Sequence, residues 1–245
     1  MVVAVSAWWR RRRGWRGEAR RRRVVGRGRR GWVAAALGQQ RVPRWKRVVD
    51  VGLVLLLLPV AAGVGLLVAG WIRLVSRGGV LFRQTRVGRG GERFTMYKFR
   101  SMSAGVETAT HEVYVRELMR HNRGLAKLDL IGDRRLIVGG RWLRMAGLDE
   151  LPQLINVLRG DMSLVGPRPL PVYEIQRIEK HAQRRRLSVK PGLTCLWQVT
   201  GRNGIKNFEE WVALDLKYID NWSFWLDLKI LAQTLPAVIR GSGAS

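Results

Sequence analysis

An uncharged apolar run near the N-terminus constrains this chain more than any other feature. From Val51 to Ile72, the 22 residues VGLVLLLLPVAAGVGLLVAGWI contain no charged side chain. A helix that spans a bilayer needs about 20 such residues, so the length alone permits a full crossing. Pro59 lies inside the run, and an interior proline removes a helix hydrogen bond and kinks the helix. The run therefore predicts a membrane anchor with a break near its middle.

The flanks of this run are basic at both ends. Arg44, Lys46 and Arg47 precede it, and Arg73 and Arg77 follow it. Positive flanks favour the cytoplasmic side, so a re-entrant helix–break–helix hairpin with both ends on that side fits the pattern. A single spanning helix fits the length equally well. In either case the backbone groups freed at the proline need partners. A buried helix of a soluble protein is a third alternative.

The chain is strongly basic. Its 245 residues hold 45 Lys and Arg against 18 Asp and Glu, a formal net charge of +27. This charge implies an anionic partner: a phosphorylated substrate, a membrane surface or nucleic acid. Residues 1–44 concentrate it in clusters such as Arg10–Arg13 and Arg20–Arg23. Such charges repel one another, so the segment is expected to be disordered or to lie loosely on anionic headgroups. An extension without a selected function is the alternative.

Cysteine and histidine usage argues against two kinds of site. Cys195 is the only cysteine, so no intrachain disulfide can form. The three histidines, at positions 111, 121 and 181, lie far apart in the sequence with no cysteine nearby. A zinc site is therefore not expected.

Beyond the anchor, the pattern predicts a small α/β domain that is mainly helical. Runs rich in Val, Phe and Tyr flank a Gly-rich turn at Gly88–Gly91, which is typical of a β-hairpin. A polar stretch follows, with a helix expected around Val113–Met119. From Leu148 to Gly160, apolar residues at i, i+3, i+4 and i+7 predict a helix, with Asp149 as its N-cap and Gly160 at its end.

The last third of the chain is predicted to begin with a rigid loop. The segment SLVGPRPLP, residues 163–171, holds three prolines that fix its course. A charged helix is expected over 172–186, and a short strand within 190–202. Residues 208–240 are predicted to form amphipathic helices on the membrane surface. Three tryptophans are expected to seat these helices at the interface: Trp211, Trp222 and Trp225.

Asp149 and Glu150 stand side by side ahead of a predicted helix, and two interpretations are open. In the structural one, Asp149 caps the helix and Glu150 complements its dipole. In the chemical one, nearby arginines such as Arg144 and Arg168 bind phosphate and keep a carboxylate ionised. With Asp161 close in sequence, the acids would also offer oxygen ligands to Mg²⁺. Phosphoryl transfer through an aspartyl intermediate is then chemically reasonable.

From about Trp45 to Arg240 the chain resembles the bacterial sugar transferase family, the monotopic phosphoglycosyl transferases. Five motifs carry the resemblance, in the family's order: RWKRVVDVGLVLLLLP, FRQTRVGRGGERFTMYKFRSM, LDELPQLINVLRGDMSLVGPRP, KPGLTCLWQVTGR and LDLKYIDNWSFWLDLKIL. The block over residues 148–169 is the most specific of them.

This resemblance implies an enzyme that moves a sugar 1-phosphate from a UDP-sugar to polyprenol (undecaprenyl) phosphate and releases UMP, as the first membrane step of polysaccharide or glycoconjugate synthesis. The implied reaction is ping-pong. Asp149 would be the nucleophile that carries the phosphosugar, Glu150 would help Asp149 to hold Mg²⁺, and Arg168 would bind phosphate. Further positions that match the family and are assigned to substrate anions are Arg144, Lys98, Arg100 and Arg202.

The resemblance also implies an architecture. Residues 45–77 would form a re-entrant anchor broken at Pro59, and residues 78–240 a cytosolic catalytic domain, with 1–44 outside both. The expected location is the cytoplasmic face of the cell membrane. The expected partners are the UDP-sugar, the polyprenol phosphate and the membrane, with no nucleic acid. The N-terminal transmembrane domain of some longer relatives is expected to be absent, and the apolar ends would allow a homodimer.

Three positions depart from the family pattern. Ile137, Val138 and Gly147 stand where the family usually has a Thr, a basic residue and a Ser. Gly147 lies two residues before the expected nucleophile and is expected to loosen that approach. Two other function classes fit less of the sequence. A membrane-tethered nucleic-acid-binding protein would explain the charge but not the ordered motifs, and the intact acidic pair argues against a pseudoenzyme.

Overall fold

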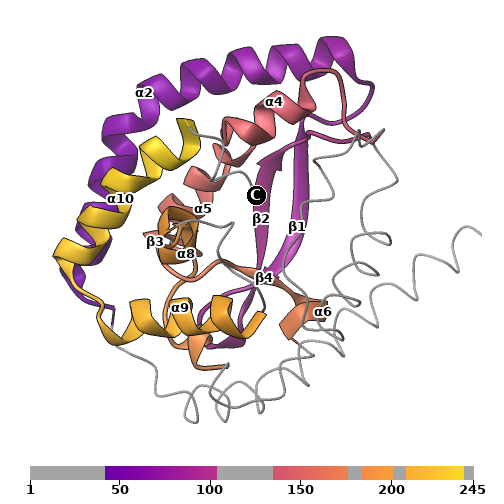
Figure 1. Ribbon diagram of the computed structural model, residues 1–245. Helices are drawn as coiled ribbons and strands as arrows, with labels where there is room; N and C mark the ends of the chain where they lie inside the picture. The colour runs from indigo at the N-terminus through magenta and orange to yellow at the C-terminus, as the bar shows by residue number, and fades with distance from the viewer. Residues whose placement is uncertain (1–41, 104–134, 176–183, 201–207, 240–245) are drawn as a thin grey trace, which may run out of the picture.

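A computed structural model describes residues 42–103, 135–175, 184–200 and 208–239. The predictions for the N-terminal segment up to residue 41, for the helix around Val113–Met119 and for Arg202 lie outside these residues. Within them the chain is mainly helical with two small sheets, in line with the fold class predicted from sequence. The long helix α2 curves along one side of the body and over one end of it (Figure 1).

The elements follow one another in the chain with short connections. The strands are β1 (Leu81–Val87), β2 (Arg93–Phe99), β3 (Ser163–Val165), β4 (Leu170–Pro171) and β5 (Gly192–Thr194). The α-helices are α2 (Arg44–Val75), α4 (Gly140–Met145), α5 (Gln153–Arg159), α6 (Val172–Ile175), α8 (Leu196–Thr200), α9 (Phe208–Asp220) and α10 (Phe224–Ile239). The 3₁₀ turns are η1 (Arg89–Gly91), η3 (Leu148–Glu150) and η4 (Arg185–Ser188).

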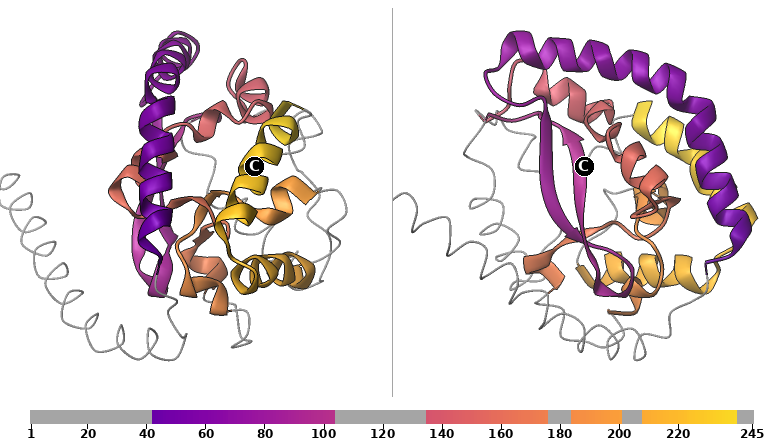
Figure 2. Two further views of the ribbon diagram at one scale, coloured as in Figure 1. Left: turned by 90° about the vertical axis from the view of Figure 1, so that its left-hand side faces the viewer. Right: turned by 180° about the vertical axis from the view of Figure 1, so that it is seen from behind.

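The apolar run forms α2, one helix of 32 residues that is long and apolar enough to cross a membrane. Pro59 lies inside the helix, which continues through it. The right view of Figure 2 agrees with Figure 1 that α2 bends and follows two sides of the body. The predicted break is thus a bend in a continuous helix, because one missing hydrogen bond kinks a long helix without ending it. The course of this helix in a bilayer stays a prediction.

One face of α2 packs on the body and the other faces outward. Val54 is fully buried in the core that α5, β3 and α10 share, and Val68 and Ile72 are buried against Phe99 of β2. Only 11% of the most apolar 18-residue window of α2 is buried. The exposed side is made of leucines, valines and a tryptophan. A helix with this much uncovered apolar surface is suited to contact with lipid.

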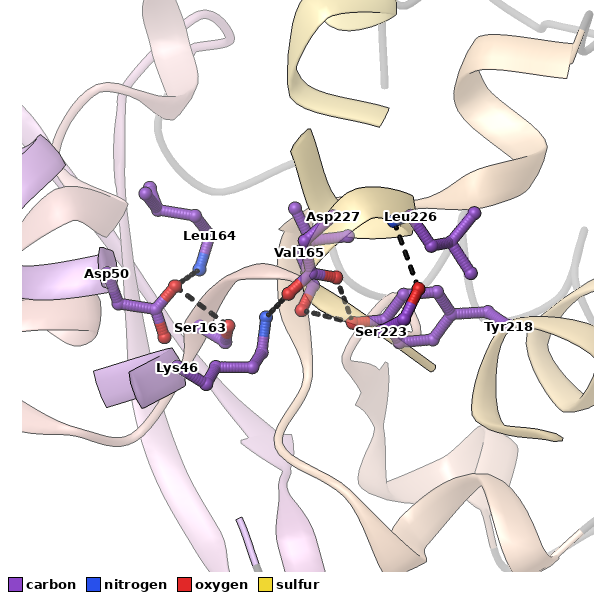
Figure 3. A network of polar contacts seen from close by, with 9 residues as sticks. All are labelled: Lys46, Asp50, Ser163, Leu164, Val165, Tyr218, Ser223, Leu226 and Asp227. Atoms are coloured by element: carbon purple, nitrogen blue, oxygen red, sulfur yellow. Dashed lines mark hydrogen bonds and ion pairs between the residues drawn. The ribbon is translucent and has the colours of Figure 1, made fainter. Parts of the chain in front are cut away.

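Buried polar contacts join the first turns of α2 to distant parts of the chain (Figure 3). Lys46 Nζ lies 2.6 Å from Oδ2 of Asp227 in α10, and each side chain is 5% exposed. The Tyr218 hydroxyl donates to Oδ1 of Asp227 at 2.7 Å. One turn further along α2, Oδ1 of Asp50 accepts hydrogen bonds from the Ser163 hydroxyl and from the next backbone amide, each at 3.1 Å. These contacts fix the base of α2 on β3, α9 and α10.

The two sheets bring together segments that are far apart in sequence. β1 and β2 form the predicted antiparallel hairpin, and its turn passes through Gly90 and Gly91 at φ +67° and +80°, which glycine adopts without steric penalty. β4 pairs with the other edge of β1, so the order is β2-β1-β4. β3 and β5 pair in parallel. The proline-rich loop over 166–169 therefore runs between the two sheets.

Two predictions near the C-terminus are only partly right. The charged helix expected over 172–186 is described at its two ends as α6 and η4, and the residues between lie outside the description. The strand within 190–202 is confirmed as β5, but the sequence did not reveal that helix α8 follows it at once.

The tryptophans expected at the membrane interface do not behave alike. Trp211 is buried, with its ring centroid 5.2 Å from that of Trp197. Trp222 is partly buried, with its ring centroid 6.4 Å from that of Trp45 and the two ring planes tilted by 52°. Trp225 is 73% exposed. The interfacial role predicted for Trp211 is wrong because its ring completes the core, whereas for Trp222 and Trp225 it stays a prediction.

Lys46→Met should lower the free energy of unfolding by about 3 kcal/mol, because removal of one partner leaves Asp227 as an uncompensated buried charge. The double variant Lys46→Met/Asp227→Leu should regain most of that loss. Arg185→Met is the control, since the Arg185–Asp220 pair is about half exposed and such pairs contribute at most about 1 kcal/mol. Denaturation in detergent, followed by tryptophan fluorescence, measures all three. Equal losses for the two single variants would contradict the prediction.

Candidate active site

Asp149 and Glu150 lie in η3, the short turn that precedes α5. Asp149 is 3% exposed and Glu150 is partly buried. Gly147 occupies the position before η3 and Pro152 the position before α5, and neither boundary has a side-chain cap. The prediction of Asp149 as an N-cap is therefore wrong, because the chain enters α5 through a 3₁₀ turn and a proline. Its carboxylate is directed to other contacts.

Gly147 shapes the entry to the acidic turn. It adopts φ +65° and ψ 11°, between the end of α4 and the start of η3. Its amide donates to the carbonyl of Arg144 at 3.2 Å, and its own carbonyl accepts from the amide of Glu150 at 3.2 Å. A residue with a Cβ is strained in this left-handed region. In contrast to the predicted loosening, glycine here suits the reversal that presents Asp149.

Contacts at its C-terminal end and along its length fix α5, the helix that follows the two acids. Both terminal nitrogens of Arg47 in α2 donate to the last carbonyls of α5, at 2.5 and 2.6 Å, which a helix end otherwise leaves without partners. Asn156, fully buried in α5, bonds to the edge of β2: it accepts from the Tyr97 amide at 3.1 Å and donates to the Thr95 carbonyl at 2.7 Å. This contact sets the register of α5 against β2, the strand that carries Lys98.

Two of the predicted cations meet the two acids. Nζ of Lys98 donates to Oε1 of Glu150 at 2.9 Å and lies 4.0 Å from Oδ2 of Asp149. Nη1 of Arg168 lies 3.9 Å from the same oxygen of Glu150. Strand β2, turn η3 and the loop before β4 therefore place opposite charges around one point. The Arg168 side chain is 20% exposed, so it remains accessible to a ligand.

Arg144 and Asp161 were also predicted near the pair. Arg144 in α4 lies with Nη1 3.8 Å from the sulfur of Met102, and its charge acts on Asp149. Asp161 lies past the other end of α5, where it accepts a hydrogen bond from Asn156 at 3.2 Å. The proposed grouping of three acids is thus not formed, because α5 separates Asp161 from the other two.

Arg100 is used by the fold. It is buried, and its guanidinium donates to the Arg77 carbonyl at 2.9 Å and to the Ser76 hydroxyl at 3.1 Å. These bonds fasten the end of β2 to the segment that leaves α2. The structure thus gives Arg100 contacts with residues 76 and 77, and its assignment to a substrate anion stays a prediction.

Burial dominates the electrostatics of the nucleophile candidate. It raises the pKa of Asp149 to about 6, and the neighbouring charge of Glu150 adds to the rise. Lys98, Arg144 and Arg168 act in the opposite direction but do not overcome the loss of hydration. The predicted effect of the arginines, which favours the ionised form, is thus present but smaller than the effect of burial. The carboxylate is still ionised at neutral pH, with a higher pKa than an exposed aspartate.

The acidic pair fits a magnesium ion that also binds substrate. Oδ1 of Asp149 is buried and has no hydrogen-bond partner among the described residues, and Glu150 adds a second carboxylate beside it. In the same part of the chain, no group of three or more His, Cys, Asp or Glu side chains gathers. Two carboxylates completed by phosphate oxygens of a substrate are the donor set that Mg²⁺ prefers.

Two buried arginines near the site were not predicted. Arg86 donates to the carbonyl of Pro169 at 3.1 Å, and Arg186 donates to the carbonyl of Arg168 at 3.2 Å. The sequence held a signal for Arg86, since it shares the inward face of β1 with Phe82 at a period of two residues. A charge on the buried face of a strand indicates a specific partner. Arg186 had no such signal, because it stands in a run of three arginines.

The comparisons with known proteins agree with this site. The sequence profile described as bacterial sugar transferase matches residues 41–241. The chain is 43% identical over 189 residues to the galactosyl transferase CpsE of Streptococcus agalactiae, which covers 74% of this chain and 41% of that protein. It is 38% identical to an undecaprenyl-phosphate galactose phosphotransferase of Salmonella typhimurium, over 81% of this chain and 41% of that protein.

A third relative is shorter. The chain is 42% identical to a UDP-glucose:undecaprenyl-phosphate glucose-1-phosphate transferase of Caulobacter vibrioides, over 81% of this chain and 71% of that protein. The chain thus spans about two fifths of the length of the first two relatives and most of the third. The residues matched by the family profile include α2, the turn with Asp149 and Glu150, and the proline-rich loop over 166–169.

Gly147→Ala should lower the free energy of unfolding by about 1 kcal/mol, because a Cβ at this positive φ approaches the following carbonyl oxygen. Gly147→Asn should lower the free energy of unfolding by less, since asparagine tolerates the left-handed region. Gly79→Ala is the control, because the nearest atom to an added Cβ there lies at an ordinary 3.8 Å. Chemical denaturation in detergent measures the three. A neutral Gly147→Ala would show that the turn is not strained.

Proposed function

The chain belongs to the bacterial sugar transferase family, and on that premise we propose that it transfers a sugar 1-phosphate from a UDP-sugar to undecaprenyl phosphate with release of UMP. The observation that carries the proposal is the buried Asp149–Glu150 pair with Lys98 and Arg168 around it. Phosphoryl transfer needs a positioned nucleophile and positive charge around the phosphorus. The names of the Salmonella and Caulobacter relatives supply the lipid acceptor, and the Caulobacter name supplies the UDP-sugar donor.

The first half of the reaction makes a covalent intermediate. Oδ1 of Asp149 attacks the β-phosphorus of the UDP-sugar, and the bond from that phosphorus to the bridging oxygen breaks. The electron pair leaves with UMP, and the sugar phosphate stays on Asp149 as an acyl phosphate. Above pH 6 most Asp149 carboxylates are ionised and carry the required lone pair. Burial keeps water from competing for the intermediate.

The second half transfers the phosphosugar to lipid. A phosphate oxygen of undecaprenyl phosphate attacks the same phosphorus, and the bond to Asp149 breaks. The product is an undecaprenyl-diphosphate sugar, and the carboxylate is regenerated. Because the same residue is attacking group in one step and leaving group in the other, a nucleophile of moderate basicity serves both directions.

Each neighbour of Asp149 has a distinct task. Arg168 is accessible and presents a guanidinium fork to the phosphates. Lys98, held at 2.9 Å by Glu150, offers a second positive charge 4.0 Å from the nucleophile. Asp149 and Glu150 are the residues that would hold Mg²⁺, which when bound supplies charge that offsets the phosphate oxygens.

We also propose that α2 lies in the cytoplasmic leaflet without crossing it. Support comes from its attachments: Arg47 near its start bonds to α5, and Trp71 near its end donates to the Val138 carbonyl at 3.1 Å. Both ends thus dock on one folded body, while the apolar face between them is exposed. Trp225 and Trp142 are exposed beside the two ends, as expected of residues at the headgroup level.

Purified protein in detergent, given undecaprenyl phosphate, Mg²⁺ and a panel that begins with UDP-glucose and UDP-galactose, should release UMP. Asp149→Asn should reduce this release at least about a thousandfold, because an amide cannot form the acyl phosphate. Without the lipid acceptor, the wild type should give a burst of at most one UMP per protein. Persistent release by a folded Asp149→Asn protein would refute the nucleophile, and no release with any sugar would refute the proposed function.

The pH profile of the burst tests the protonation state. Because the pKa of Asp149 is raised to about 6, the burst rate should fall as the pH drops through 6, instead of near 4 as for an ordinary aspartate. Lys98→Met should lower the rate at all pH values and move the midpoint upward, since Lys98 lowers the pKa of Asp149. A midpoint that moves down in this variant would contradict the assignment.

Cysteines at positions 44 and 77, both exposed flanks of the apolar run, should react from the same side of the membrane. A membrane-impermeant maleimide should label Arg44→Cys and Arg77→Cys in inside-out vesicles and neither in spheroplasts. The native Cys195 is buried and gives no background. Labelling of one position from each side would refute the re-entrant placement and favour a spanning helix.

A further inference from the structure

We propose that Arg86 and Arg186 are positioning residues that hold the backbone of the loop over 166–169 so that the Arg168 side chain faces the transferring phosphate. The identity of the phosphate that Arg168 binds rests on the proposed function. The proposal assigns a task to two buried arginines whose contacts lie outside the Asp149–Glu150 pair. Their contacts are to the loop backbone, to the carboxylate of Asp215 and to the amide side chain of Gln84.

The loop has few donors of its own. Prolines at positions 167, 169 and 171 lack the backbone N–H, so its carbonyls must find partners elsewhere. Three consecutive carbonyls of the loop find such partners, and each donor comes from a different element. Pro167 accepts from the Gly192 amide at 2.9 Å, Arg168 accepts from Arg186 at 3.2 Å, and Pro169 accepts from Arg86 at 3.1 Å. Three consecutive peptide planes are thereby fixed, and with them the direction of the Arg168 side chain.

Arg186 is itself held rigidly. It is 3% exposed, its Nη2 lies 2.5 Å from Oδ2 of Asp215, and its guanidinium lies over the Trp211 ring at 5.3 Å. Burial raises the pKa of Asp215 to about 6, so the pair is ionised at neutral pH. A buried ion pair of this kind adds little net stability. Its use is better explained by the geometry it imposes on the Arg168 carbonyl.

Arg86, in strand β1, holds the next carbonyl of the loop, that of Pro169. Its Nη2 donates to the Gln84 side chain at 2.6 Å, while Nη1 donates to Pro169. Burial lowers the pKa of Arg86 to about 10, which leaves it charged at neutral pH. A small, partly open hollow lies beside the loop, lined in part by Pro167, Leu170 and Arg186.

The same conservative substitution at three arginines tests the inference. Both contacts of Arg186 come from its Nη2. The shorter lysine side chain in Arg186→Lys keeps a positive charge near Asp215 but places its ammonium short of the Arg168 carbonyl. Arg86→Lys likewise gives up one of two bonds. Arg185→Lys is the matched control, because Arg185 stands next to Arg186 in η4 and forms an exposed pair with Asp220.

In the UMP-release assay, Arg186→Lys and Arg86→Lys should each lower kcat/KM for the UDP-sugar about tenfold, the usual effect of losing one charged hydrogen bond. Arg185→Lys should stay within about twofold of wild type. In an Arg168→Ala background, the further effect of Arg186→Lys should shrink to less than about twofold, because residues that act through one another are not additive. An undiminished tenfold effect in that background would show a merely structural role and overturn the inference.

Hydrogen exchange tests the positioning without any turnover. Peptides that cover residues 163–171 should exchange faster in Arg186→Lys and in Arg86→Lys than in wild type, with Arg185→Lys unchanged. If exchange is unchanged in both buried variants, the inference fails whatever the activity. If the loop is loosened but wild type releases no UMP, the positioning stands and the proposed function fails.

Discussion

Arg47 and Trp71 stand near opposite ends of α2, and each donates hydrogen bonds to a segment that borders the acidic turn. Arg47 bonds to the last carbonyls of α5, which follows the turn, and Trp71 bonds to the carbonyl of Val138, which precedes α4. The apolar helix thus holds the elements on both sides of Asp149. Packed elements, rather than a linker, therefore connect α2 to the site. In a bilayer, this would fix the height of the nucleophile relative to the phosphate of a lipid substrate.

The second constraint is the burial of two acids in a chain with net charge +27. Away from water, the attraction between opposite charges is stronger, and the free-energy cost of removing each charge from water is larger. Burial also lowers the pKa of Lys98, against the opposing effect of Glu150 and Asp149. The acids and cations are therefore interdependent, since each ion is stable in the site only with the others. The resulting pKa of Asp149, near 6, combines ionisation at neutral pH with more basicity than an exposed aspartate, a balance suited to attack on phosphorus.

Local patterns in the sequence predicted what depends on neighbours along the chain. The hairpin followed from β-rich runs around glycines, and the end of α5 followed from Gly160, which adopts φ +86°. The meeting of Lys98, Glu150 and Arg168 followed only from the family motifs, since three separate segments supply them. The remaining errors concern partners set by tertiary structure. No pattern reveals that an arginine bonds to the carbonyls of residues 76 and 77, as Arg100 does.

The departures from the family pattern lie where the anchor meets the segment before the nucleophile. Ile137 is buried with the anchor residues Val68 and Ile72, so an apolar side chain there strengthens the attachment of α4 to α2. Gly139 adopts φ +75°, and an added Cβ would lie 2.9 Å from Nε1 of Trp71. Trp71 can therefore reach the carbonyl of the preceding residue only across a glycine. Ile137 and this close contact act together: they hold the start of α4 against the anchor, and α4 ends at Met145, two residues before the glycine that turns the chain toward Asp149.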